Sequence, residues 1–316
     1  MISERLDEYH LESRGQLPLF IKMPSPTNPL LLPTPLPEDI GGERRLARVQ
    51  AARELEALAG QGLRLKRPVF FVPGWTGESA MAWLTPYTPR HTATKMWIDR
   101  IFRNATDYTV YVTLAEESPH CHSFCDFGQI VVEKIGERQP CDCVGHSMGG
   151  LDIAAAIALC HPPLLNVQHF IAFGSPLRGT EWGEIRAKLG GLLPHLLDQA
   201  KSMDPDQPFI KRLQSPESLQ RLLSRVKNVY SLYGTRDMAV RRSPKLSYRH
   251  IDPNWQGADP EDFKKKVRVI DIQGAEHTGR LGITQDPRAV LWLVRILGDL
   301  PLPEVKLNHG YLFRSL

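Results

Sequence analysis

The residues with the clearest chemical potential lie in one short run, Gly145-His146-Ser147-Met148-Gly149. The two glycines carry no Cβ, so a strand and a helix can approach closely across a sharp turn at this point. Such a turn strains the serine at its apex and projects the hydroxyl, as a nucleophile requires. A strand-like run precedes the motif and an alanine-rich run follows it. We therefore predict that Ser147 is a nucleophile; the alternative is an ordinary strand-to-helix turn.

A serine hydroxyl becomes a good nucleophile only when a base accepts its proton and a third group orients that base. His277 comes just after the last predicted core strand, and we predict that it is the base. His146 occupies the variable position of the motif and is expected to point away from the nucleophile. Asp237 ends a strand in a Gly-Thr-Arg-Asp turn, and we predict that it is the acid, although turn aspartates also make purely local hydrogen bonds. The rival acids are Asp252, Asp259 and Glu276.

Attack by a serine on a carbonyl places negative charge on the carbonyl oxygen, which backbone N–H groups must stabilise. We predict that Met148, at the start of the helix, supplies one N–H group. The second is expected from the loop after the strand over 68–72, from Trp75 or, in reserve, from Thr76. The predicted substrate-binding residues are Gly74, Thr76, Ser175 and Leu177.

Strands alternating with helices are expected to position these residues. Compact apolar or alternating runs predict strands over 68–72, 108–114, 141–146, 167–173, 226–233 and 267–272. Amphipathic or alanine-rich runs predict helices over 43–58, 95–104, 126–137, 152–159 and 284–297. This alternation implies a mainly parallel sheet with helices on both faces. Because ligands bind at the carboxyl ends of such strands, Ser147, Asp237 and His277 should gather at one edge.

The expected organisation is one core with additions. A proline-rich arm and a helix form residues 1–65, and the core comprises residues 66–180 and 226–316. Between them, residues 181–225 contain leucine-rich amphipathic pieces and are predicted to form a helical cap or lid. Two interpretations of these leucines stay open: they form the apolar underside of a cap, or they simply pack onto the core.

Composition excludes several classes of protein. The chain has 316 residues, 42% of them apolar and 23% charged, with a net charge of +4. This small charge does not indicate a nucleic-acid partner. The sequence also contains no run of about 18 apolar residues, which a membrane-spanning helix would need. The five cysteines are an odd number, which favours reduced thiols and a cytoplasmic setting, with a leader-trimmed secreted form as the alternative. A zinc site formed by four of them, Cys121, Cys125, Cys141 and Cys143, is the less favoured interpretation, so we expect no metal.

These motifs resemble a known family. The chain is similar to bacterial lipases and carboxylesterases of the α/β-hydrolase superfamily over about residues 66–298. The resemblance is carried by the late histidine and by three motifs: Phe71-Val72-Pro73-Gly74-Trp75, Gly145-His146-Ser147-Met148-Gly149-Gly150 and Ser175-Pro176-Leu177-Arg178-Gly179-Thr180. In two respects the chain departs from the family. Pro73 stands where the family usually has histidine before the oxyanion glycine, and the acid and base are separated by an inserted loop over 241–263.

The resemblance implies an α/β-hydrolase fold and ester hydrolysis through an acyl-enzyme, without an organic cofactor. The expected substrate is a small-molecule or lipid-like ester, with transient contact with a lipid interface if the cap opens. A short-chain esterase, a thioesterase and an acyltransferase would use the same triad. The alternative from another class is a catalytically silent hydrolase fold that serves as a binding protein.

Overall fold

The structure is a computed structural model, and it describes residues 42–74, 80–86, 92–114, 123–180, 202–237, 239–240, 265–279, 281–302 and 311–314. The chain divides into two compact units, Met1–Leu31 and Leu32–Leu316. All of the described residues belong to the second unit. The predicted proline-rich arm over residues 1–40 lies outside the described residues.

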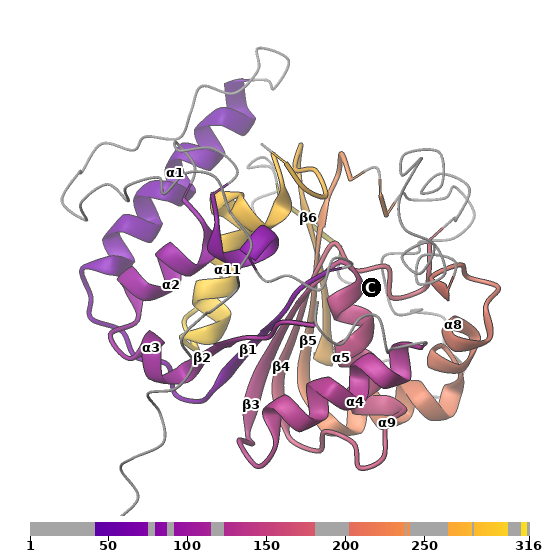
Figure 1. The fold of residues 1–316 in the computed structure, drawn as a ribbon. Coiled ribbons are helices and arrows are strands. Elements are labelled where there is room, and N and C mark those ends of the chain that lie inside the picture. The colour runs from indigo at the N-terminus through magenta and orange to yellow at the C-terminus, as the bar shows by residue number, and fades with distance from the viewer. Residues whose placement is uncertain are drawn as a thin grey trace, which may run out of the picture. The chain divides into compact units, whose positions relative to one another are not determined.

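A single sheet of seven strands forms the centre of the described part of the chain (Figure 1). The strand order is β2-β1-β3-β4-β5-β6-β7. The first six strands are parallel, and β7 pairs antiparallel with β6. The strands are β1 (Val69–Val72), β2 (Thr109–Tyr111), β3 (Cys141–His146), β4 (Val167–Phe173), β5 (Val226–Gly234), β6 (Val267–Ile272) and β7 (Tyr311–Arg314). The mainly parallel sheet expected from the sequence is therefore confirmed.

Helices cover both faces of this sheet (Figure 1). One layer contains α1 (Gly42–Ala59), α2 (Thr94–Ile101) and α11 (Pro287–Leu297), which contact one another. The other contains α4 (Phe124–Ile135), α5 (Met148–Ala158) and α9 (Pro216–Arg225), with α5 in contact with both of its neighbours. Shorter elements are α3 (Ala105–Tyr108), α8 (Pro208–Leu213), the π-helical turn η1 (Ala80–Leu84) and the 3₁₀ turn η3 (Ile283–Gln285).

Residues along the central strands alternate between the two layers, as the period of a strand requires. On β3, Cys143 packs into the core beneath α4 and α5, whereas Val144 packs into the core beneath α1 and α11. Every residue of β3 and of α5 is buried. Ser147 therefore lies between two elements whose residues are all buried.

The start of α11 is fixed by a buried charge cluster. Asp286 caps the helix and accepts hydrogen bonds from the Arg288 backbone N–H at 3.0 Å and from its Nε at 2.9 Å. Arg48 of α1 lies 3.6 Å from the same carboxylate. Burial would raise the pKa of Asp286, but the guanidinium groups of Arg288 and Arg48 lower it to about 2. A carboxylate that stays ionised above about pH 4 thus links α1 to α11.

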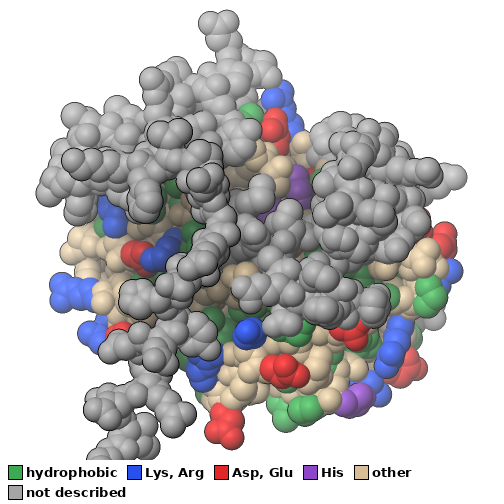
Figure 2. Space-filling view, in the orientation of Figure 1, with side chains coloured by type: hydrophobic (Ala, Val, Ile, Leu, Met, Phe, Trp, Pro, Cys, Tyr) green, Lys and Arg blue, Asp and Glu red, His purple; other side chains and the backbone are tan. Residues whose placement is uncertain are grey.

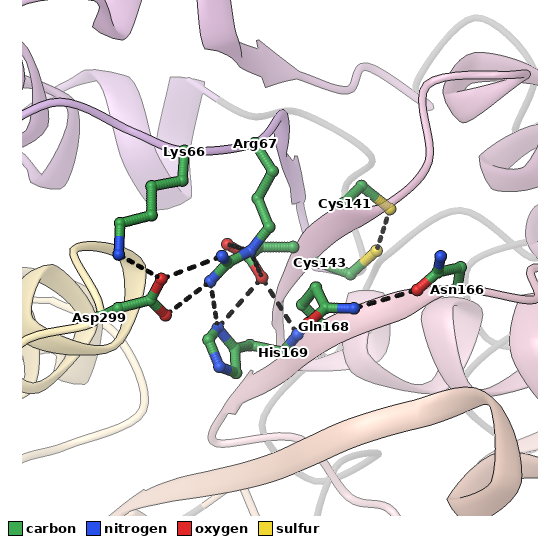
Figure 3. A network of polar contacts seen from close by, with 9 residues as sticks. Lys66, Arg67, Cys141, Cys143, Asn166, Gln168, His169 and Asp299 are labelled. Atoms are coloured by element: carbon green, nitrogen blue, oxygen red, sulfur yellow. Dashed lines mark hydrogen bonds and ion pairs between the residues drawn. The ribbon is translucent and has the colours of Figure 1, made fainter.

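A second polar network lies at the amino-terminal ends of the strands (Figure 3). On β3 this is the end opposite to Ser147. The Nε of Arg67 donates to Oδ1 of the buried Asp142 at 2.9 Å, and the two terminal nitrogens donate to Asp299. The backbone N–H of His169 donates to the same Oδ1 at 3.0 Å. These bonds connect the start of β1, β3, β4 and the segment after α11. Removing one partner of a buried ion pair costs about 3–5 kcal/mol, because the other charge is left uncompensated, so we expect substitutions in this network to destabilise the sheet.

The carboxyl-terminal part of the predicted cap segment is described. Helix α9 packs against α5 and β5, and Leu219, Leu222 and Leu223 lie in the same core as the face of α5. The leucine-rich pieces for which two interpretations were left open lie over 182–197, so the choice between those interpretations stays open. Residues 181–201, the rest of the predicted cap, lie outside the described residues, and a cap there stays a prediction.

The surface of the described residues is mixed in charge. Figure 2 shows Lys and Arg side chains interspersed with Asp and Glu side chains on the visible face. Such a distribution suits solubility rather than attraction to one highly charged partner. None of the described helices has the length and apolarity needed to cross a bilayer.

Candidate active site

Ser147 lies at a sharp turn between β3 and α5. Its backbone has φ 54° and ψ −124°, a conformation that costs a non-glycine residue about 1–3 kcal/mol. The turn is possible because its glycines touch backbone: a Cβ on Gly145 would lie 2.6 Å from the nitrogen of Gly150. A Cβ on Gly149 would lie 2.2 Å from the carbonyl oxygen of Pro73. The motif therefore requires both glycines to bring the helix onto the strand ends.

Three side chains from the carboxyl ends of the strands form a linear hydrogen-bonded chain. Nε2 of His277 lies 2.9 Å from Oγ of Ser147, and Nδ1 of His277 lies 2.9 Å from Oδ2 of Asp237. Ser147 follows β3, Asp237 follows β5, and His277 follows β6. The structure thus brings together the three residues that the sequence assigned to a triad, and their catalytic roles stay a prediction.

The carboxylate of Asp237 is held on both oxygens. Its Oδ1 accepts from the backbone N–H groups of Ala239 at 2.9 Å and Val240 at 2.8 Å, and only 2% of the residue is exposed. Oδ2 is thereby aimed at His277. Gly174, with φ 55°, passes beside this contact, where a Cβ would lie 3.1 Å from both Oδ2 and Nδ1. A carboxylate accepts only, so Nδ1 carries the proton and Nε2 is free to accept from the serine hydroxyl.

Among the rival acids, Asp252 and Asp259 lie outside the described residues. Glu276 precedes the histidine, and its backbone N–H and C=O bond to Leu281 and Ile283, each at 2.8 Å. Of the described carboxylates considered for the role, Asp237 is the one in hydrogen-bonding contact with the His277 ring.

Of the residues expected to stabilise an oxyanion, Met148 is described, and so is Gly74, which was predicted to bind substrate. Met148 is the first residue of α5, where backbone N–H groups have no partner within the helix. Gly74 is buried beside the serine, and a Cβ there would lie 3.0 Å from Cβ of Ser147. The chain after β1 therefore runs directly past the nucleophile. Trp75 and Thr76 lie outside the described residues, so their predicted roles are untested.

The two predicted substrate-binding residues after β4 have packing contacts. Ser175 is fully buried, its side chain faces Gly150 of α5, and its carbonyl accepts from the Tyr233 hydroxyl at 2.6 Å. Leu177 is 1% exposed and lies in the core beneath α5. These contacts fix the loop behind the nucleophile, and contact with substrate stays a prediction for both residues.

The sequence analysis did not predict the contact between His146 and His277. The centroid of the His146 ring lies 4.9 Å from that of His277, and its Nε2 lies 3.2 Å from the His277 carbonyl oxygen. Burial, and then the neighbouring His277, lower the pKa of His146 to about 3. Alternation along β3 was the available signal, because residue 146 must share the face of Val144, opposite α5.

Three of the four cysteines of the zinc interpretation are described. Cys141 and Cys143 are fully buried on β3, with their sulfur atoms 3.9 Å apart, and both pack into the core. Cys125 lies on α4, and Cys121 is outside the described residues. The described residues contain no group of three or more His, Cys, Asp or Glu side chains placed to hold a metal ion.

Comparison with solved structures shows the fold. Lipase B of Aspergillus fumigatus matches with a TM-score of 0.51 and 15% identity, over 78% of this chain and 55% of that one. A Bacillus licheniformis lipase in its mature form matches with a TM-score of 0.44 and 16% identity, over 74% of this chain and 92% of that one. The phospholipase PlaB of Legionella pneumophila, in complex with thio-NAD, matches with a TM-score of 0.46 and 13% identity, over 73% of this chain and 58% of that one.

This chain thus matches about half the length of the Aspergillus lipase. No protein-family model matches the sequence, and no curated protein is significantly similar to it. Together with the strand order, the structural likeness shows that the chain has the α/β-hydrolase fold.

Proposed function

We propose that this protein is a serine ester hydrolase that cleaves carboxylic, lipid-like esters through an acyl-enzyme. The observation that carries the proposal is the continuous chain of contacts from Ser147 through His277 to Asp237, with both distances at 2.9 Å. Geometry of this kind is what a hydroxyl nucleophile requires, since it pairs the nucleophile with a base and the base with an orienting group.

In the proposed reaction, Oγ of Ser147 attacks the ester carbonyl carbon while its proton passes to Nε2 of His277. The buried carboxylate of Asp237 stabilises the imidazolium that forms. Collapse of the tetrahedral intermediate breaks the carbon–oxygen bond of the ester, and Nε2 returns the proton to the departing alcohol. Water then repeats the sequence on the acyl-enzyme and releases the carboxylic acid, so no external oxidant or reductant is needed.

The oxyanion of each intermediate is proposed to lie against the backbone N–H of Met148. The positive end of the α5 dipole adds to that hydrogen bond. We propose Trp75 as the second donor, with Thr76 in reserve, because Gly74 brings the chain past the nucleophile. Removing one such donor typically costs 100- to 1,000-fold in kcat.

The preference for lipid-like esters is supported by the structural likeness to the Aspergillus lipase. The other acyl-transfer activities, short-chain esterase, thioesterase and acyltransferase, would use the same three residues. A catalytically silent binding protein is the least favoured alternative, because such a protein would not require Ser147, His277 and Asp237 to be aligned as they are here.

Hydrolysis of p-nitrophenyl esters with short to long acyl chains tests the proposal, with Ser147→Ala measured alongside. We expect activity that rises toward long chains and disappears in the variant. A fluorophosphonate probe should label the native protein and leave Ser147→Ala unlabelled. Folded protein that neither cleaves an ester of any length nor takes up the probe would refute the proposed function, and activity limited to short chains would make it an esterase.

A further inference from the structure

His146 is enclosed on three sides. The ring meets the fully buried Trp83 edge-on, with centroids 6.1 Å apart at 80°. On another side, a Cβ on Gly74 would lie 3.4 Å from Nδ1 of His146, so the chain after β1 passes directly over the ring. On the third side lies His277, in a tilted stack at 34°. The ring therefore has a single position, between the loop beside the nucleophile and the loop of the base.

The protonation state of this ring follows from its surroundings. His146 is 5% exposed, and with its pKa lowered to about 3 it is neutral at any pH at which the protein would work. A neutral imidazole carries one N–H. Nε2 faces the carbonyl oxygen of His277, which can only accept, so the proton is on Nε2 and the bond runs from His146 to His277.

The loop that carries His277 needs such a bond. It follows β6 through two glycines with positive φ, Gly274 and Gly279. Glu276 is held by backbone bonds to Leu281 and Ile283, and the next carbonyl, that of His277, is held by His146. Asp237 fixes one nitrogen of the His277 ring but not the backbone from which the ring projects.

We propose that His146 is a positioning residue: its Nε2–H anchors the His277 backbone and thereby the imidazole that projects from it. The inference deepens the proposed function and rests on it. The group touches neither the nucleophile Oγ nor, in the proposed reaction, the substrate. Its contribution is to keep Nε2 of His277 at 2.9 Å from Ser147. A misplacement of about 1 Å can cost about 100-fold in rate.

Two variants separate the hydrogen bond from simple packing. Glutamine places an N–H donor where Nε2 of histidine lies, whereas alanine removes both donor and ring. We expect His146→Ala to lower kcat about 10- to 100-fold with KM within about twofold of the native value. His146→Gln should stay within about threefold of native kcat. The matched control is His169→Gln, another buried histidine, on β4 in the network of Figure 3, which should leave both constants unchanged.

The outcomes are decisive in each case. The inference is wrong if His146→Ala keeps native kcat, or if the glutamine variant loses as much kcat as the alanine variant. Should His146→Ala fail to fold, the glutamine variant decides alone: near-native kcat supports the inference, and a large loss overturns it. The rate of fluorophosphonate labelling gives a second readout. Unlabelled native protein refutes the proposed function and this inference with it, whereas equal labelling of native and His146→Ala protein refutes this inference only.

Discussion

Asp237→Asn is the substitution whose consequence follows most directly from the structure. The two side chains have the same shape, so the change replaces one carboxylate oxygen by an NH₂ group. Oδ1 accepts from the N–H groups of Ala239 and Val240, and an NH₂ group cannot take that place without two donor–donor contacts. The amide nitrogen must therefore face His277, where it donates to Nδ1.

This reversal places the imidazole proton on the wrong nitrogen. With Nδ1 accepting, the neutral ring carries its proton on Nε2, which then cannot accept from Ser147. An asparagine that leaves the geometry of a serine triad intact but traps this tautomer lowers kcat by about 10⁴-fold, equivalent to about 5 kcal/mol in the barrier. We expect that loss here, in ester hydrolysis and in fluorophosphonate labelling alike, with a melting temperature close to native.

Glu276→Gln is the matched control, since it removes a carboxylate next to His277 that makes no contact with the ring among the described residues. We expect less than about a threefold change in kcat. An Asp237→Asn protein that retains more than a tenth of native kcat would contradict the reasoning, because the tautomer could not then depend on this carboxylate. Substitution of the rival acids Asp252 and Asp259 would be the next experiment.

Three further predictions concern the turn at Ser147 and the stability of the fold in acid. Gly149→Ala places a Cβ 2.2 Å from a Pro73 oxygen, so we expect a loss of about 1–3 kcal/mol in stability together with most activity; Gly60→Ala, whose Cβ would meet its nearest atom at 3.7 Å, should change neither melting temperature nor rate. Ser147→Gly should have a free energy of unfolding about 1 kcal/mol higher than that of Ser147→Ala, and should melt at a higher temperature, because only glycine relieves the strain of the positive φ. Equal melting temperatures would mean that the turn is not strained. Asp286 has its pKa lowered from 3.8 to about 2, so its contribution is complete above pH 4 and is lost as the pH falls through 4 to 2. The contribution of Asp286 to the free energy of unfolding is about 2 kcal/mol. In Asp286→Asn, the free energy of unfolding measured with urea should therefore depend less on pH between 4 and 2.

Much of this architecture could be predicted because its signals are local. The parallel strands are short apolar runs, and each predicted strand overlaps an observed one, as β4 does over residues 167–173. The predicted helices likewise overlap observed ones, as the run over 284–297 does with α11. Strand β7 was missed because Tyr311–Arg314 is four residues long and its antiparallel pairing with β6 depends on distant parts of the chain.

The contrast between local signals and long-range packing also explains which residues of the site could be predicted. Ser147, Asp237 and His277 could be chosen because each directly follows a predicted strand, and parallel strands end at a common edge. The role of α9 could not be settled, because a leucine-rich amphipathic helix looks the same whether it covers a sheet or a ligand. The contact of His146 with His277 was not predicted, because it depends on how the strand that carries His146 packs against the loop that carries His277.

Neighbouring residues of β3 thus serve opposite faces of the sheet. Ser147 leaves the strand toward α5, with its N–H bonded to the Phe173 carbonyl at 2.9 Å, and so its strained φ is held by a core that cannot relax. His146 leaves toward the layer of α1 and α11, where Trp83 fixes it against the base. A one-residue slip of β3 would exchange these two side chains. The buried pairing of β3 with both β1 and β4 therefore sets the position of Ser147, the proposed nucleophile, and, if the inference about His146 holds, that of the proposed base His277 as well.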